Sequence, residues 1–228
     1  MGRTTYVPTV AIMNVPDFTD DEGNWFKSAS TVHDGVIYQY RTRSFCVWAG
    51  VNSRTMDLAY MTNRRPNYLG CKNLFSDFNS FTEWCLSQHG YLNREVNGKY
   101  WQLDKDMLVL GNKNYGPDTC MFVPCHINNL FQSGISKNST SNLPIGVMVN
   151  QQGSGFIAQC KVHYKNSARI GRFDTPESAH QAWQGAKIGE ILYHAGRDEL
   201  GQKLQGALFE HATRIQADLD NNRQTFLY

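Results

Sequence analysis

The strongest constraint on the fold is the alternating stretch FIAQCKVHY at residues 156–164. One set of alternate side chains is apolar or aromatic, and the other set contains Gln159, Lys161 and His163. Because successive side chains of a strand point to opposite faces, this alternation predicts a strand with one apolar and one polar face. Short strand-like segments on either side, separated by turn residues, extend the prediction to a three-stranded antiparallel sheet within residues 146–175.

A helix is predicted directly after this sheet. Thr175 is a favourable N-cap and Pro176 suits the first helical position. The segment PESAHQAWQGAKIGEILYHAG carries several alanines beside Trp183, which favours close packing on a sheet. Further along, leucine and isoleucine recur near helical spacing between residues 200 and 219 and predict a last amphipathic helix.

Length and composition are those of a folded protein. The chain has 228 residues, of which 41% are hydrophobic, enough for one large or two small domains. The polar stretch QSGISKNSTSNLP has no periodicity and is typical of a linker. We therefore expect one domain at residues 1–132 and another at 143–228. The formal net charge is only +2, so a nucleic-acid surface would require local clustering of Lys and Arg.

The six cysteines are scattered and form no CxxC pair. This spacing favours reduced thiols in a cytoplasmic protein over a zinc knuckle or a disulfide framework. No apolar run approaches the roughly 18 residues of a membrane span, and no signal peptide is predicted.

Before residue 90, Phe75, Phe78, Phe81 and Trp84 recur every three residues. This spacing predicts a helix with an aromatic stripe, and a stripe of this kind usually forms part of a core.

Residues 101–131, WQLDKDMLVLGNKNYGPDTCMFVPCHINNLF, read as strand, turn, strand and helix. In an extended strand Asp104 and Asp106 would face the same side, so a site with two carboxylates on one cation is one interpretation. The other interpretation is that they are solvated residues at a strand end.

Two stretches resemble known families. LDKDMLVLGNKNYGPDTCMFVPCHINNLF resembles the HNH, or ββα-metal (His-Me finger), module of phage-encoded homing-type endonucleases. LPIGVMVNQQGSGFIAQCKVHYKNSARIGRFDTPESAHQAWQGAKI resembles the APETALA2/ethylene-response-factor DNA-binding domain that is often joined to such nucleases. The resemblance covers roughly residues 45–215. It implies an α+β chain with a ββα-metal nuclease-like domain, then a three-stranded antiparallel sheet packed on a helix, and a C-terminal helix.

The nuclease resemblance implies a metal site for Mg²⁺ or Mn²⁺ on Asp104 and Asn128. The position of the general base falls on Lys105, where the family has histidine. An ordinary ammonium group cannot accept a proton at neutral pH, although it could stabilise developing negative charge. Asp106 would add a second carboxylate, and His126 is a candidate replacement base, but it lies two positions from Asn128 and so on another helix face.

One further position of the nuclease pattern is a loop-bracing asparagine. It aligns with Thr119, and Asn112 or Asn114 is the alternative.

The second resemblance implies that the polar face of the sheet contacts DNA. The candidate contacts are Gln159, Lys161, His163, Arg169 and Arg172. Arg and Lys can pair with phosphates or with guanine edges. The plainer alternative is that an antiparallel sheet simply has one wet face.

Together these features predict a metal-dependent, site-specific endonuclease or nickase acting on double-stranded DNA, encoded by a bacteriophage and acting in the host cytoplasm. The main alternative is a catalytically inactive, domesticated nuclease that binds DNA as a repressor, and Lys105 is its best support. A scaffold without DNA binding is the third hypothesis. The sequence sets neither the target site nor the oligomeric state.

Overall fold

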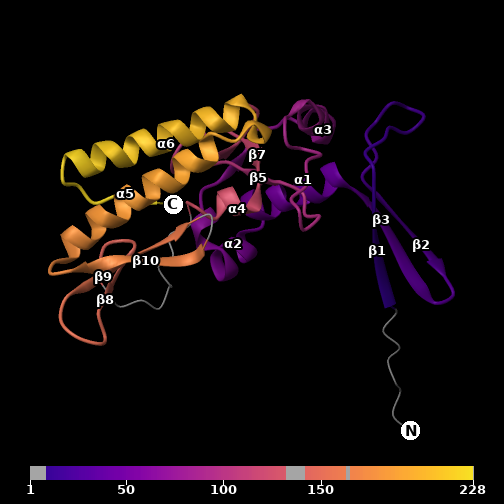
Figure 1. The fold of residues 1–228 in the computed structure, drawn as a ribbon. Coiled ribbons are helices and arrows are strands. Elements are labelled where there is room, and N and C mark those ends of the chain that lie inside the picture. Colours follow the sequence, from indigo (N-terminus) through magenta and orange to yellow (C-terminus); the bar gives the residue numbers. More distant parts are fainter. Residues whose placement is uncertain (1–8, 132–141, 163–164, 228) are drawn as a thin grey trace, which may run out of the picture. The chain divides into compact units, whose positions relative to one another are not determined.

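The computed structural model describes residues 9–131, 142–162 and 165–227, and the chain is mixed α+β, as predicted (Figure 1). Contacts divide it into two compact units, Met1–Tyr91 with Asn112–Cys120, and Leu92–Gly111 with Met121–Tyr228. The first is called the N-terminal unit below, and the second the C-terminal unit. This grouping differs from the expected division at residues 132–143, because the predicted hairpin and helix belong with the C-terminal sheet. Among the described residues, no helix has the length and apolar character needed to cross a membrane.

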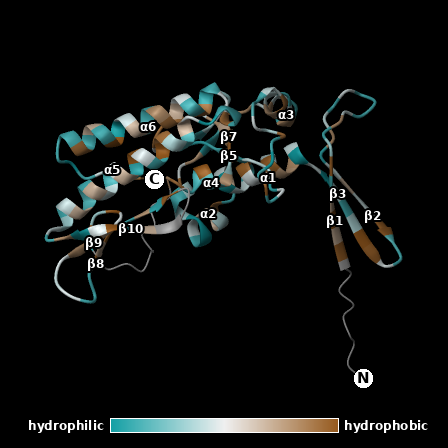
Figure 2. Ribbon diagram, viewed as in Figure 1, coloured by the Kyte–Doolittle hydropathy of each residue, from teal (hydrophilic) through white to brown (hydrophobic). Residues whose placement is uncertain are grey.

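The N-terminal unit begins with a three-stranded sheet in the order β1-β3-β2, in which β3 pairs parallel with β1 and antiparallel with β2. Its strands are β1 (Thr9–Val15), β2 (Ser28–His33) and β3 (Val36–Thr42). Apolar residues on β1 and β2 are visible in Figure 2, and Val10, Ile12 and Val32 are exposed. This sheet therefore contributes little to a core.

The core of the N-terminal unit is formed by its helices. They are α1 (Arg43–Thr55), α2 (Leu58–Arg64), the 3-10 turn η1 (Pro66–Tyr68) and α3 (Phe78–Ser87), with a small sheet of β4 (Lys72–Asn73) and β6 (Asn114–Tyr115). Phe81 on α3 is fully buried, and its ring centre lies 4.9 Å from that of Phe75 and 5.0 Å from that of Trp48. The aromatic stripe is core, as predicted.

The C-terminal unit contains a short hairpin and a sheet covered by helices. The hairpin comprises β5 (Gln102–Asp104), β7 (Met121–Val123) and α4 (Cys125–Asn128). The sheet has the order β10-β9-β8, all antiparallel, with β8 (Val147–Val149), β9 (Phe156–Val162) and β10 (Lys165–Phe173). The remaining elements are α5 (Pro176–Ala195), η2 (Asp198–Leu200) and α6 (Gln202–Asp220).

The predicted sheet and helix are both present. Thr175 caps α5 by accepting a hydrogen bond from the Ser178 backbone N–H at 3.1 Å. Ala158 and Cys160, on one face of β9, are buried in a cluster with Trp183 of α5. α5 therefore covers the face that carries Ala158 and Cys160. The opposite face, called the open face below, carries the exposed Lys161.

The hairpin has the predicted order of strand, strand and helix. However, β5 and β7 share only three residue pairs, and α4 has only four residues. An element pair this small does not by itself establish a ββα-metal fold.

Gly146 is expected to be intolerant of substitution. Its φ is +80°, and a Cβ there would lie 2.0 Å from the Trp183 ring. Gly98 is a matched control, because its φ is +78° but its Cβ position is open. We expect Gly98→Ala to cost about 1–2 kcal/mol for the left-handed backbone alone, and Gly146→Ala to cost about 1–3 kcal/mol more for the clash. Urea unfolding followed by far-UV circular dichroism measures the difference, and equal losses would contradict the packing described.

Candidate functional site

The uncovered face of the β8–β10 sheet carries the residues predicted to contact DNA. Ala158 and Cys160 point toward α5, so Gln159 and Lys161 point away from it. Arg169 pairs with Gln159 across the β9–β10 ladder and therefore lies on the same open face. Both Lys161 and Arg169 are exposed.

A register shift in β10 brings Arg172 to this face as well. Residues three apart in a regular strand point to opposite sides. The ladder shifts between Arg169 and Gly171, so Arg172 pairs with Ile157, two residues from the partner of Arg169. Arg172 is exposed and donates a hydrogen bond to Ser154 Oγ at 2.9 Å. The irregularity thus places a second arginine beside the first, which no alternation in the sequence predicts.

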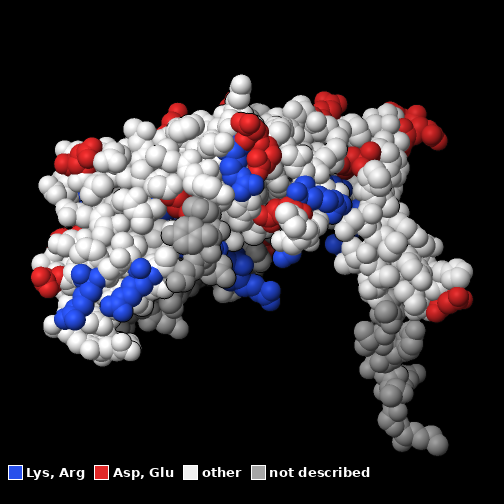
Figure 3. All heavy atoms as spheres, viewed as in Figure 1, with Lys and Arg blue, Asp and Glu red and all other residues white. Residues whose placement is uncertain are grey.

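The open face carries three exposed cationic side chains. Figure 3 shows Lys and Arg side chains gathered over the β8–β10 sheet. Within the described residues, Lys161, Arg169 and Arg172 form no ion pair. The side chain of His163, predicted as a further contact, lies outside the described residues. Three exposed cations on one surface, without carboxylate partners among the described residues, are suited to contact the phosphate backbone of a nucleic acid.

At the hairpin, Asp104 ends β5 and holds the turn that follows. Its Oδ1 accepts hydrogen bonds from the backbone N–H groups of Asp106, at 2.8 Å, and Met107, at 2.7 Å. Burial raises the pKa of the Asp104 carboxyl above its ordinary value, despite these two bonds. Its Oδ2 accepts no hydrogen bond from any described residue, so this oxygen is the one that could bind a cation.

Asn128 lies on the same side of the hairpin as Asp104. Its Nδ2 donates to Gln102 Oε1 at 3.4 Å. Gln102 and Asp104 are two apart on β5, so their side chains share a face and their Cα atoms are about 7 Å apart. The structure therefore brings Asn128 next to Gln102, two residues before Asp104 on β5, without a direct bond between the two predicted ligands.

Lys105 is buried and paired. It is 6% exposed, and its Nζ lies 2.7 and 2.6 Å from the two oxygens of Asp106. In this arrangement Lys105 neutralises a carboxylate, and it is not poised to accept a proton. The ion pair also occupies Asp106, the predicted second carboxylate.

Lys105→Met is expected to be a stability mutation. It leaves the carboxylate of Asp106, whose side chain is 18% exposed, without its cation. Breaking a buried pair from one side costs about 3 kcal/mol or more. We expect Lys105→Met/Asp106→Asn to recover much of that loss in urea unfolding. A Lys105→Met protein of wild-type stability would show that the pair is not structural.

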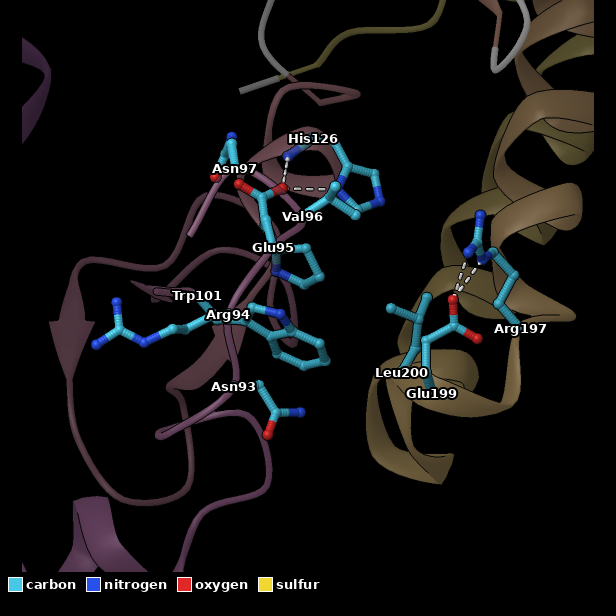
Figure 4. Close-up of a pocket in the computed structure, with 11 residues that line it drawn as sticks. Asn93, Arg94, Glu95, Val96, Asn97, Trp101, His126, Arg197, Glu199 and Leu200 are labelled. Atoms are coloured by element: carbon cyan, nitrogen blue, oxygen red, sulfur yellow. Dashed lines mark hydrogen bonds and ion pairs between the residues drawn. The ribbon is translucent and has the colours of Figure 1, made fainter. Parts of the chain in front are cut away.

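His126 lies at the other end of the hairpin, in the wall of a cavity of about 750 Å³ (Figure 4). Its Nδ1 is 2.7 Å from Glu95 Oε1, and its backbone N–H donates to the same oxygen at 3.2 Å. Burial opposes ionisation of Glu95, but the bonds from His126 outweigh it and hold the pKa of this carboxyl below its ordinary value. Arg197 and Glu199 stand on the opposite wall and pair with each other at 2.5 Å.

The order of the hairpin explains why His126 is apart from Asp104. Asp104 pairs with Met121 at the start of β7, whereas α4 begins only after the Val123 pair. His126 therefore contacts Glu95, in the chain before β5, whereas Asp104 is the last residue of β5. Of the predicted site residues, Asp104, Lys105 and Asp106 contact one another around the end of β5, Asn128 contacts Gln102 at its start, and His126 contacts Glu95.

Asn112–Cys120 form the loop for which the sequence predicted a bracing residue. Asn112 and Thr119, two of the three candidates, hold this loop by hydrogen bonds to Asn114. Asn112 accepts a hydrogen bond from the Asn114 backbone N–H at 2.9 Å and donates to the Asn114 carbonyl at 2.7 Å. Thr119 Oγ1 donates to the same carbonyl at 2.8 Å.

Glu95 and His194 were not predicted from the sequence. Glu95 is 31 residues from His126, and nothing in its surroundings marks it. Glu190 and His194, bonded at 3.0 Å, are four apart on α5, a spacing that pairs side chains on one helix face and could have indicated this contact.

Within the described ranges, no three His, Cys, Asp or Glu side chains are grouped to hold a metal ion. Asp104 and Asn128 offer one carboxylate and one amide oxygen, a donor set that suits Mg²⁺, which retains several waters. No family model, curated protein or solved structure matches the chain.

Proposed function

We propose that this protein binds double-stranded DNA through the open face of the β8–β10 sheet. The observation that supports this proposal is the ladder that aligns Lys161, Arg169 and Arg172 on the face away from α5. A twisted three-stranded sheet presents side chains along a ridge, and such ridges fit the major groove of B-DNA. The resemblance of this segment to the APETALA2-type domain supports the same function.

Recognition of a particular sequence is assigned to Gln159 together with Arg169. An arginine can pair with guanine O6 and N7, and a glutamine with adenine N6 and N7. These two side chains are cross-strand neighbours, so they would meet adjacent base pairs. Arg172, tethered to Ser154, is better suited to a phosphate.

Selection from a pool of random duplexes tests this function. Full-length protein is mixed with the pool, bound duplexes are recovered by gel shift, and the cycle is repeated. We expect enrichment of a short common motif. Binding without any enriched motif would reduce the proposal to non-specific affinity, and absence of binding would contradict it.

We propose cleavage of the bound DNA as a second function, supported by the placement of Asp104 and Asn128 on one side of the hairpin. A divalent cation held there would supply Lewis-acid activation of a phosphate and of water. Asp104 Oδ2 and the Asn128 amide would bind it, while Lys105, committed to Asp106, would take no part. A plasmid carrying the selected motif, incubated with Mg²⁺ or with EDTA, separates a nuclease from a binding protein that does not cut.

A further inference from the structure

Two histidines of the C-terminal unit lie against each other outside the Asp104 site. His126 is on α4, and His194 is in the last turn of α5. Their ring centres are 5.4 Å apart, with an angle of 51° between the planes. His194 is only 6% exposed, whereas half of the His126 side chain is exposed, in the wall of the cavity.

Each ring uses one nitrogen to contact a glutamate. His126 Nδ1 lies 2.7 Å from Glu95 Oε1, and His194 Nε2 lies 3.0 Å from Glu190 Oε1. An ionised carboxylate only accepts hydrogen bonds, so each of these nitrogens carries the proton. The neutral tautomers then have their lone pairs on His126 Nε2 and His194 Nδ1.

The lone pair of His194 is the unusual feature. Its Nδ1 is buried and has no hydrogen-bond partner among the described residues. A buried polar atom without a partner costs about 1–3 kcal/mol, so each such atom in a native fold calls for an explanation.

We propose that His126 Nε2 and His194 Nδ1 together bind a transition-metal ion of the Zn²⁺ class. With Zn–N bonds of about 2.0–2.1 Å, two imidazoles on one tetrahedral ion have ring centres about 5 Å apart, close to the separation here. Metal-ligating histidines usually donate their other N–H to a carboxylate, and Glu95 and Glu190 are in that position.

Charged side chains of both signs surround the two rings and the cavity. Carboxylates of Glu95, Glu190 and Glu199 stand around the two rings and the cavity, against the guanidinium groups of Arg94 and Arg197. No third ligating side chain is grouped with the histidines in the described ranges, so the remaining positions fall to water from the cavity. Imidazole donors select Zn²⁺, Co²⁺, Ni²⁺ or Cu²⁺ over Mg²⁺, so this site is independent of the proposed cleavage.

Titration of the full-length protein, prepared without a histidine tag, with Co²⁺ tests the site through the visible absorption of the ion, and competition with Zn²⁺ gives the affinity for zinc. We expect binding of one ion, at least tenfold weaker in His126→Ala. This histidine is half exposed, so its removal should not prevent folding. Glu95→Gln should weaken binding about 10-fold or more by releasing the ring.

His33→Ala is the matched control. His33 is also paired with a carboxylate, Asp34 at 3.1 Å, but lies exposed in the N-terminal unit. We expect this variant to bind Co²⁺ as the wild type does. Equal binding by His126→Ala and wild type, or no binding by the wild type, would overturn the proposal.

Discussion

We expect Asp104→Asn to lower the rate of the proposed Mg²⁺-dependent DNA cleavage by about 10²–10³-fold, the loss that follows when one preorganised electrostatic contact to the reacting centre is removed. The substitution replaces the one carboxylate that the hairpin offers to a cation, while the amide oxygen can still accept the two backbone bonds of the turn. Rates are measured on a plasmid that carries the selected motif, and DNA affinity is measured in parallel. Wild-type cleavage by Asp104→Asn would remove Asp104 from the reaction.

The stability of Asp104→Asn shows whether slower cleavage results from loss of the carboxylate charge or from unfolding of the protein. Burial raises the pKa of Asp104 in the folded chain, so the folded state holds its proton to higher pH than the unfolded chain does. Stability is therefore lost as pH rises from the unfolded pKa through the raised folded pKa. We expect Asp104→Asn to be at least as stable as wild type at neutral pH. Asp104→Ala, which also removes the acceptor, should lose about 1–2 kcal/mol.

We expect Arg169→Ala to weaken the proposed binding of the selected duplex by about 1–3 kcal/mol, or roughly 5- to 150-fold, and to relax specificity at one base pair. The arginine is exposed, lies opposite Gln159 on the open face, and pairs with no carboxylate among the described residues. Its removal should therefore take away the proposed contact to DNA without disturbing the packing of Ala158 and Cys160 against α5. Fluorescence anisotropy with duplexes that carry the motif gives the affinity, and comparison with scrambled duplexes gives the specificity.

Lys203→Ala is the control for net charge. Lys203 is an exposed cation of the same unit, on α6, away from the β8–β10 sheet. Loss of one positive charge there should change DNA affinity little. If Lys203→Ala and Arg169→Ala weakened binding equally, diffuse charge, and not the open sheet face, would account for the interaction.

The C-terminal sheet and helix could be predicted because their signals are local. Alternation in β9 reports one buried and one open face, and Thr175 with Pro176 marks the start of α5. The aromatic stripe of α3 is equally local. By contrast, the parallel pairing of β1 with β3 depends on contacts between segments 27 residues apart, which no periodicity records.

The site was only partly predictable for the same reason. Short motifs contain Asp104, Asn128 and the cations of the β8–β10 sheet. The sequence could therefore predict which strand or helix carries each of these side chains. The burial of Lys105 against Asp106 could not be predicted, because the exposure of a side chain depends on how the whole chain packs. The contacts of Glu95 with His126 and of His126 with His194 join segments distant in sequence. The β10 register shift that turns Arg172 outward breaks the alternation, and Gly171, which stands at the shift, is its one sign in the sequence.

The most direct test of the central claim is the salt dependence of binding to the selected duplex, measured for wild type and for Arg172→Ala. If Lys161 and Arg172 displace counterions from phosphates, the logarithm of the association constant should fall with the logarithm of salt concentration at a slope of about −2 for wild type, and the slope should be smaller by about 1 in the variant. Duplex binding that is absent, insensitive to salt, or of the same slope in both proteins would contradict DNA recognition by this sheet.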